Sequence, residues 1–259
     1  MRILAIGDVV GKPGRKCLEK VLPRLINSYD YELIIANGEN AAGGNGITEK
    51  VFYDLKEMGI DIITGGNHIW DNKEIFNFID RERSLIRPLN YPPDITPGRG
   101  WALIERRGIK IAVINLLGRI FMEAVDCPFR AVDKCLTELK SQANVVIIDM
   151  HAEATSEKQA MGWYLNSKVS AVLGTHSHVQ TADERILPGK TAYITDIGMV
   201  GLYDSILGVD REGPLKRFLT QLPHRLEISK GREVFNAVEV EVDSSSGKAL
   251  TIKRLYEVT

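Results

Sequence analysis

A repeated pattern of a short apolar run, a polar loop and a stretch of helical periodicity dominates this sequence of 259 residues. The first run, residues 2–7, ends at Asp8; glycines and a proline in residues 11–14 predict a loop, and a helical stripe begins at Cys17. Further runs of this kind span residues 32–36, 60–64, 145–148, 169–173 and 191–195. Strands that alternate with helices predict an α/β fold.

The C-terminal segment has a different pattern. Val238, Val240 and Val242 alternate with glutamates, and a turn over residues 244–247 precedes a second alternating stretch. This period of two predicts an antiparallel hairpin with one face toward solvent. Because we see no repeat, low-complexity tract or linker, we expect residues 1–259 to form a single domain.

Composition excludes several classes of protein. A net charge of −1 argues against a chain built chiefly to wrap nucleic acid or to lie on an anionic membrane. The three cysteines have no close paired spacing, so neither a disulfide framework nor a zinc-thiolate site is indicated. Asp8 interrupts the first apolar run too early for a signal peptide or a membrane span. We therefore expect a cytoplasmic protein.

Five of the apolar runs end in residues that bind metals or carry protons. His176 and His178 stand two residues apart after one run, and on an extended backbone their imidazoles would face the same way. The complete set is Asp8, Glu39, Asn40, Asn67, His68, His151, His176 and His178. Each has an ordinary alternative role, as a helix cap, turn residue or core histidine. Because ligands bind beyond the carboxyl ends of strands in open α/β sheets, the whole set favours one site.

The number of candidate ligands predicts two metal ions. Two adjacent cations need an anion between them, and Glu39 suits that bridging position, with a water or hydroxide as the second bridge and the nucleophile. Oxygen and imidazole ligands without thiolate favour manganese or iron, with zinc or magnesium less selectively bound. His68 is the candidate general acid, because Asn67 would occupy a metal and leave its neighbour free to face substrate. Asp71 is a candidate to orient that ring.

These blocks resemble a known superfamily. Gly7-Asp8, Glu39-Asn40, Gly66-Asn67-His68, Met150-His151 and Gly174-x-His176-x-His178 are similar in order and spacing to the five motifs of the calcineurin-like metallophosphoesterases. Residues 7–14 and 37–44 resemble the bacterial YmdB subgroup in particular. The resemblance implies two packed mixed sheets flanked by helices, and a phosphodiesterase acting on small cyclic nucleotides, 2',3'- or 3',5'-cyclic. Relatives are often oligomeric, so it also implies a homo-oligomer.

The resemblance also implies how the ligands divide. The first metal would take Asp8, Glu39, Asn40 and His178, and the second Glu39, Asn67, His151 and His176. Three positions depart from the superfamily pattern. Val10 stands where most members have a histidine ligand, and Asn40 would supply the missing ligand instead. Glu39 stands where aspartate is usual, and Ile69 follows the catalytic histidine where an acidic residue is usual.

The sequence offers several candidates for substrate contacts and more than one function for the metal site. Backbone amides at Gly43 and Gly44 are candidates to approach phosphate, although such a loop is more often only a turn. Arg119 and Arg130 are candidates to clamp a phosphate or nucleotide, although a lone loop arginine is usually a surface ion-pair partner. The same centre would also serve a phosphomonoesterase or an RNA nuclease. A third alternative is a metal- or nucleotide-binding regulatory protein with weak catalysis.

Overall fold

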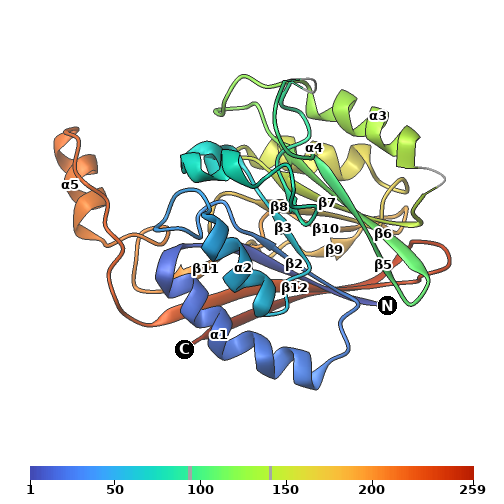
Figure 1. Cartoon of the computed structure of the whole chain (residues 1–259), viewed down its shortest axis with the longest axis horizontal. Coiled ribbons are helices and arrows are strands. Elements are labelled where there is room, and N and C mark those ends of the chain that lie inside the picture. The colour runs from blue at the N-terminus through green and yellow to red at the C-terminus, as the bar shows by residue number, and fades with distance from the viewer. Residues whose placement is uncertain (93–94, 140–141) are drawn as a thin grey trace.

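Two sheets pack face to face between two layers of helices (Figure 1). The structure is a computed structural model that describes residues 1–92, 95–139 and 142–259. The predicted architecture of two packed mixed sheets flanked by helices is confirmed.

In the described ranges the first sheet contains seven strands. Five of them, β11, β1, β2, β3 and β4, are parallel to one another. The C-terminal hairpin adds two antiparallel strands to this sheet, as the alternating valines predicted. The order of strands in the sheet is β13 (Ala249–Val258), β12 (Glu233–Val242), β11 (Met199–Leu202), β1 (Arg2–Val9), β2 (Leu33–Asn37), β3 (Ile62–Thr64) and β4 (Leu85–Ile86).

The second sheet contains six strands among the residues that the structure describes, with β6, β7, β8 and β10 parallel and the two edge strands antiparallel. Its order is β5 (Trp101–Arg106), β6 (Ile109–Leu117), β7 (Val145–His151), β8 (Ala171–Thr175), β10 (Ala192–Ile194) and β9 (Arg185–Ile186).

Apolar side chains fill the space between the sheets. Ile3 and Ile35 of the first sheet belong to the same buried cluster as Ile147 and Leu173 of the second. The outer faces are covered by α1 (Gly11–Ser28), α2 (Glu49–Glu57), α3 (Pro128–Leu139) and α4 (Thr155–Tyr164) (Figure 1). Because the central strands are buried on both faces, they read as continuous apolar runs.

Helix α1 begins earlier than the sequence pattern suggested. The expected loop over residues 11–14 was wrong, because α1 begins at Gly11 and includes the residues that follow it. Pro13 fits the first turn, where its missing N–H costs no helical hydrogen bond. Gly14 lets the helix approach β11: a Cβ at this position would lie 2.3 Å from the Val200 carbonyl oxygen.

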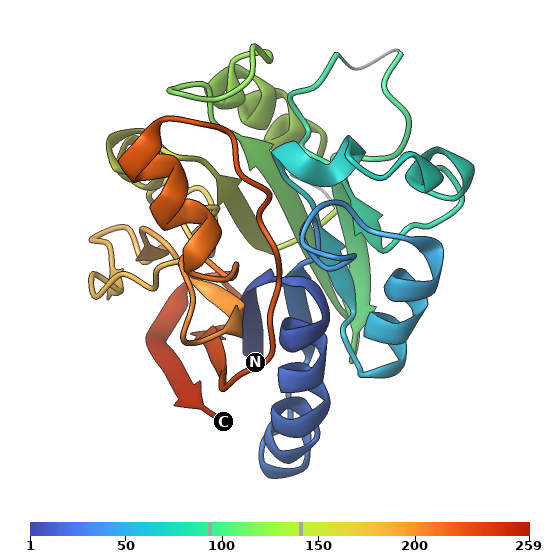
Figure 2. The same cartoon turned by 90° about the vertical axis from the view of Figure 1, so that its left-hand side faces the viewer.

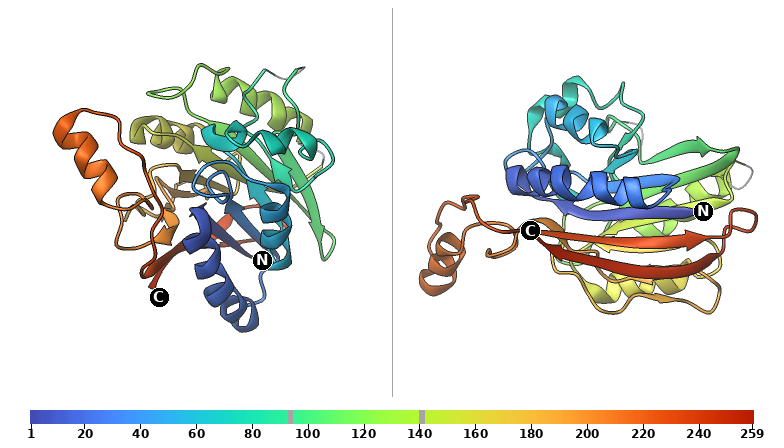
Figure 3. Two further views of the ribbon diagram at one scale, coloured as in Figure 1. Left: turned by 60° about the vertical axis from the view of Figure 1, so that its left-hand side comes forward. Right: turned by 90° about the horizontal axis from the view of Figure 1, so that it is seen from below.

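A short helix stands away from the body of the protein. Helix α5 (Glu212–Thr220) projects beyond the sheets, and the chain returns from it past the N-terminal end of α1 (Figures 2 and 3). Two single-turn 3-10 helices, η1 (Asn67–Trp70) and η2 (Lys73–Asn77), follow β3. None of the helices within the described ranges is both long and apolar enough to cross a membrane.

Candidate metal centre

The carboxyl ends of strands from both sheets meet at one place. Strands β1 and β2 bring Asp8 and Glu39 from the first sheet, and η1 brings Asn67 after β3. Strand β7 ends at His151, and His176 follows β8 of the second sheet. The centre therefore lies at the junction of the two sheets, so its geometry depends on how they pack.

Three ligand-type atoms converge on one nitrogen of His151. Its Nε2 lies 3.0 Å from Glu39 Oε1, 3.0 Å from Asn67 Oδ1 and 3.1 Å from His176 Nδ1. Ligand atoms of Glu39, His151 and His176 all lie within 4.8 Å of one another. One ring nitrogen carries at most one proton and so cannot satisfy three partners. A cation among these atoms would satisfy them together.

A second group of side chains lies beside the first. Asp8 Oδ1 is 3.8 Å from His178 Nε2 and 3.9 Å from His151 Nδ1. Asn40 Nδ2 lies 3.4 Å from both Glu39 Oε1 and His178 Nε2. Glu39 thus contacts both groups through one oxygen, since its Oε1 lies 3.0 Å from His151 Nε2 and 3.4 Å from Asn40 Nδ2.

Burial shapes the electrostatics of this centre. Burial raises the pKa of Asp8 above its ordinary value. Burial also acts to raise the pKa of Glu39, but the adjacent His151 outweighs it and leaves that pKa below its ordinary value. Burial acts to lower the pKa of His151, but Glu39 and the other carboxylates raise it to about 9. Burial and the neighbouring His151 lower the pKa of His176 to about 3.

These residues fit divalent cations. Asp8 Oδ1 is buried without a hydrogen-bond partner among the described residues, which is costly unless a cation contacts it. Space at the centre is kept clear, because a Cβ at Gly66 would lie 2.4 Å from both Glu39 Oε2 and His151 Nε2. The donor atoms are carboxylate, amide and imidazole, a set that suits iron, manganese, zinc or magnesium.

His68 lies at the edge of the centre and faces solvent. Its backbone N–H donates to Glu39 Oε2 at 2.7 Å, while the imidazole remains 37% exposed. His68 Nδ1 lies 2.8 Å from Asp71 Oδ2. Asp71, three residues after His68, is thus placed to orient the imidazole ring. The residue directly after His68 is the apolar Ile69, which cannot take that role.

The two histidines after β8 do not lie on extended backbone, so that expectation was wrong. The strand ends at Thr175, and His176 and His178 have φ angles of 101° and 64°. Such left-handed conformations need support from neighbouring structure. Ser177, between them, donates its N–H to the buried Asp196 carboxylate at 3.0 Å, which anchors the turn. Both imidazoles still reach the centre.

Several supporting residues were missed at the sequence level. Thr175 Oγ1 lies 3.0 Å from His151 Nδ1 and donates to Asp149 Oδ1 at 2.6 Å, so it links this imidazole to a buried carboxylate. Asn37 Nδ2 is 3.3 Å from the same nitrogen. Such partners orient ligand imidazoles. A signal did exist, since Asp149 stands in an otherwise apolar run two residues before His151.

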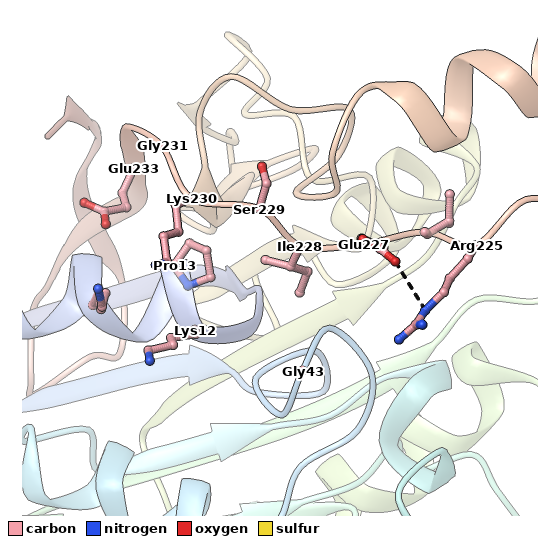
Figure 4. Close-up of a pocket in the computed structure, with 12 residues that line it drawn as sticks. Lys12, Pro13, Gly43, Arg225, Glu227, Ile228, Ser229, Lys230, Gly231 and Glu233 are labelled. Carbon is pink, nitrogen blue, oxygen red and sulfur yellow. Dashed lines mark ion pairs between the residues drawn. The ribbon is translucent and has the colours of Figure 1, made fainter.

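The candidate substrate residues lie outside this cluster. Arg119 and Arg130 come together, but they line a separate cavity of about 650 Å³ with Tyr91 and Trp101. Among described contacts, neither guanidinium touches a candidate ligand. Gly43 lines a third region, a groove beside α1 (Figure 4). The assignment of Gly43, Gly44, Arg119 and Arg130 to substrate binding stays a prediction.

Comparison with known proteins agrees with the fold and the motifs. The family described as YmdB-like protein matches residues 4–255. A Bacillus subtilis protein named 2',3'-cyclic-nucleotide 2'-phosphodiesterase is 51% identical over 255 residues, which cover 98% of this chain and 96% of the relative. A crystal structure of a hypothetical protein from Thermus thermophilus is 43% identical with a TM-score of 0.93, covering 100% of this chain and 99% of that one. A Mycoplasma pneumoniae structure, described as a novel phosphatase, is 34% identical with a TM-score of 0.94, covering 100% and 93%. The chain therefore belongs to the YmdB-like protein family.

Proposed function

We propose that this protein is a metal-dependent phosphodiesterase that hydrolyses small cyclic nucleotides, 2',3'-cyclic ones first among them. The observation that carries the proposal is the convergence of Glu39, Asn67 and His176 on one nitrogen of His151, beside a buried Asp8 oxygen that has no described partner. The name of the Bacillus subtilis relative, 51% identical, supports the choice of substrate.

We assign the ligands to two divalent metal ions, with iron or manganese favoured over zinc or magnesium. One ion would be held by Asp8, Glu39, Asn40 and His178, and the other by Glu39, Asn67, His151 and His176. The position of Glu39, 3.0 Å from His151 and 3.4 Å from Asn40, supports its shared role. When bound, such a pair neutralises phosphate charge and lowers the pKa of a nucleophilic water.

The leaving oxygen needs a proton, and we assign its donation to His68. In the proposed reaction a water oxygen bonds to phosphorus and loses a proton to solvent, the bond from phosphorus to O2' breaks, and O2' takes a proton from the imidazole, which regains one from solvent. The product is a 3'-phosphomonoester. Asp71, at 2.8 Å, would hold His68 Nδ1 so that Nε2 faces the substrate. Arg119 and Arg130, in a cavity of their own with Tyr91, would contact the nucleoside part rather than the reacting phosphate.

The test compares two variants and two kinds of substrate. Glu39→Ala should lose bound metal and turnover together. His68→Ala should retain metal but hydrolyse 2',3'-cyclic AMP about 10²- to 10⁴-fold more slowly, the usual contribution of a general acid. It should act nearly normally on bis(p-nitrophenyl) phosphate, because that leaving group needs no proton.

His224→Ala, which changes the one histidine outside the cluster, is the matched control and should behave like the wild type. An equal loss on both substrates for His68→Ala would refute the proton donor. Metal-loaded wild-type protein that binds cyclic nucleotides without turning them over would refute the enzyme and favour a regulatory role.

We also propose that the protein forms homo-oligomers through α5. Phe218 and Leu219 on this helix expose 74% and 83% of their surface, and the same arm carries an apolar cavity of about 740 Å³ lined by Phe218 and Leu222. A surface with both exposed apolar side chains and an apolar cavity can bind the same surface of a second copy of the protein. Leu219→Glu should lower the sedimenting mass. The equally apolar but distant Leu250→Glu should not.

A cytoplasmic location completes the proposal. All three cysteines are free thiols. A reducing compartment maintains cysteines in that form.

A further inference from the structure

We propose that a lysine-lined groove beside the metal centre binds the phosphate backbone of single-stranded RNA whose 3' end carries the cyclic phosphate. The inference rests on the proposed function and extends it from mononucleotides to oligonucleotides. The groove encloses about 580 Å³ between the first turns of α1 and the returning segment 225–231 (Figure 4).

The groove presents positive charge that the protein does not neutralise. Lys12 and Lys16 lie one helical turn apart on α1, and Lys230 lies on the facing segment. In the described ranges these lysines form no ion pair. The other charged side chains that line the groove form ion pairs. Arg225 pairs with Glu227 at 3.6 Å, and Glu233 pairs with Lys20, which lies outside the groove. Three free ammonium groups in a chain of net charge −1 form a local site for anions.

The groove and the metal centre share one loop. Asn40, a candidate ligand, accepts a hydrogen bond from the Gly11 N–H at 2.9 Å, and Gly43 lines the groove three residues later. Three residues of chain span at most about 11 Å. Ile228 lies beside this loop, since a Cβ at Gly11 or at Gly44 would come within 2.5 or 2.9 Å of its Cδ1. The groove therefore begins within about 11 Å of a candidate ligand, a distance that a strand of a few nucleotides spans.

The chemistry of the substrate favours RNA as the occupant. A 2',3'-cyclic phosphate forms at the 3' end of an RNA strand when a 2'-hydroxyl attacks the adjacent phosphodiester. Such an end has further phosphates on its 5' side, and these need a positively charged path. Lysines contact phosphates without reading bases, and none of the twelve described lining residues is aromatic. The groove should thus bind the backbone regardless of sequence.

The test uses a tetraribonucleotide and a mononucleotide, both ending in a 2',3'-cyclic phosphate, with metal-loaded full-length protein. Three phosphate contacts predict a salt slope of roughly 2, so raising salt from 50 to 200 mM should increase KM for the tetranucleotide about 20-fold. The triple variant K12A/K16A/K230A should lose that dependence and its preference for the longer substrate. Its turnover of the mononucleotide should not change. The matched control K110A/K248A/K253A removes the same charge from exposed positions elsewhere and should retain the preference.

Binding without turnover separates this inference from the proposed function. Fluorescence anisotropy with a labelled decaribonucleotide ending in a 3'-phosphate measures the groove even if no cyclic nucleotide is hydrolysed. Equal affinity of wild type and K12A/K16A/K230A would overturn the inference. So would equal losses in the control variant, or binding of anionic phosphatidylglycerol vesicles through these lysines without binding of RNA.

Discussion

A buried ion pair beneath the histidine turn should be one of the most sensitive points of the structure. Lys158 Nζ lies 2.6 Å from Asp196 Oδ2, and the two side chains are 1% and 0% exposed. Lys158→Met would keep the apolar stem of the side chain and remove its charge. Of the donors that the structure describes, the Asp196 carboxylate would then retain the Ser177 and Gly198 N–H groups alone, at 3.0 and 2.8 Å.

The expected cost follows from leaving a buried carboxylate without its cation. Breaking such a pair typically costs about 3–5 kcal/mol, and the two remaining donors place this case near 3 kcal/mol in the free energy of unfolding. Because Ser177 lies between His176 and His178, the affinity for metal should also fall. Removing both charges in K158M/D196N should recover part of the stability, since no charge is then left buried alone, although the asparagine amide can accept only one of the two N–H groups that the carboxylate accepts.

Urea unfolding of the metal-free protein measures the loss in the free energy of unfolding, and metal titration measures the loss in metal affinity. Lys168→Met is the matched control: this lysine is about half exposed and its 3.6 Å pair with Asp133 should contribute less than about 1 kcal/mol. A loss below 1 kcal/mol for Lys158→Met, or no recovery in the double variant, would refute the reasoning.

Three further predictions concern the centre, the thiols and the domain. Gly66→Ala should abolish metal binding without changing the circular dichroism spectrum, because its Cβ would lie 2.4 Å from the ligand atoms of Glu39 and His151 and would displace them; normal metal content would contradict this. Cys127, which is partly exposed, should react fast with a thiol reagent at pH 8, whereas burial raises the pKa of Cys17 to about 11 and of Cys135 to about 12, so both should react only on unfolding. We propose that residues 1–259 form one domain, and a single urea transition followed by both fluorescence and circular dichroism would check this, two separated transitions being the contrary result.

Much of the fold follows from residue patterns that act locally. Each apolar run became a strand because a β-strand buried on both faces needs an unbroken apolar stretch, and the alternating valines of β12 became a strand with one wetter face. Thr48 caps α2 by accepting the Val51 N–H at 3.2 Å, as a threonine before an amphipathic stripe predicts. The ligand residues could be grouped into one site for a similar reason, because the carboxyl ends of parallel strands lie at the same edge of a sheet.

What the patterns could not supply depends on distant contacts. Strand β11 is short and follows a turn at Gly198, so its place beside β1 is set by pairing rather than by periodicity. Helix α5 was not predicted because its exposed Phe218 and Leu219 produce no inward apolar face. The left-handed backbone at His176 was also inaccessible, because it depends on Asp196, twenty residues away in the chain.

The position of the centre between two sheets has a consequence for stability. Carboxylates and amides come from the first sheet and imidazoles from the second, so metal affinity should depend on the apolar layer that holds the sheets in register. Leu173→Ala removes a side chain from that layer, and Leu22→Ala removes one from the outer layer under α1; both are at most 2% exposed. Each should cost about 2–5 kcal/mol of stability. Only Leu173→Ala, two residues before the anchoring Thr175, should also weaken metal binding. Equal metal affinities in the two variants would show that each sheet holds its ligands independently of the other.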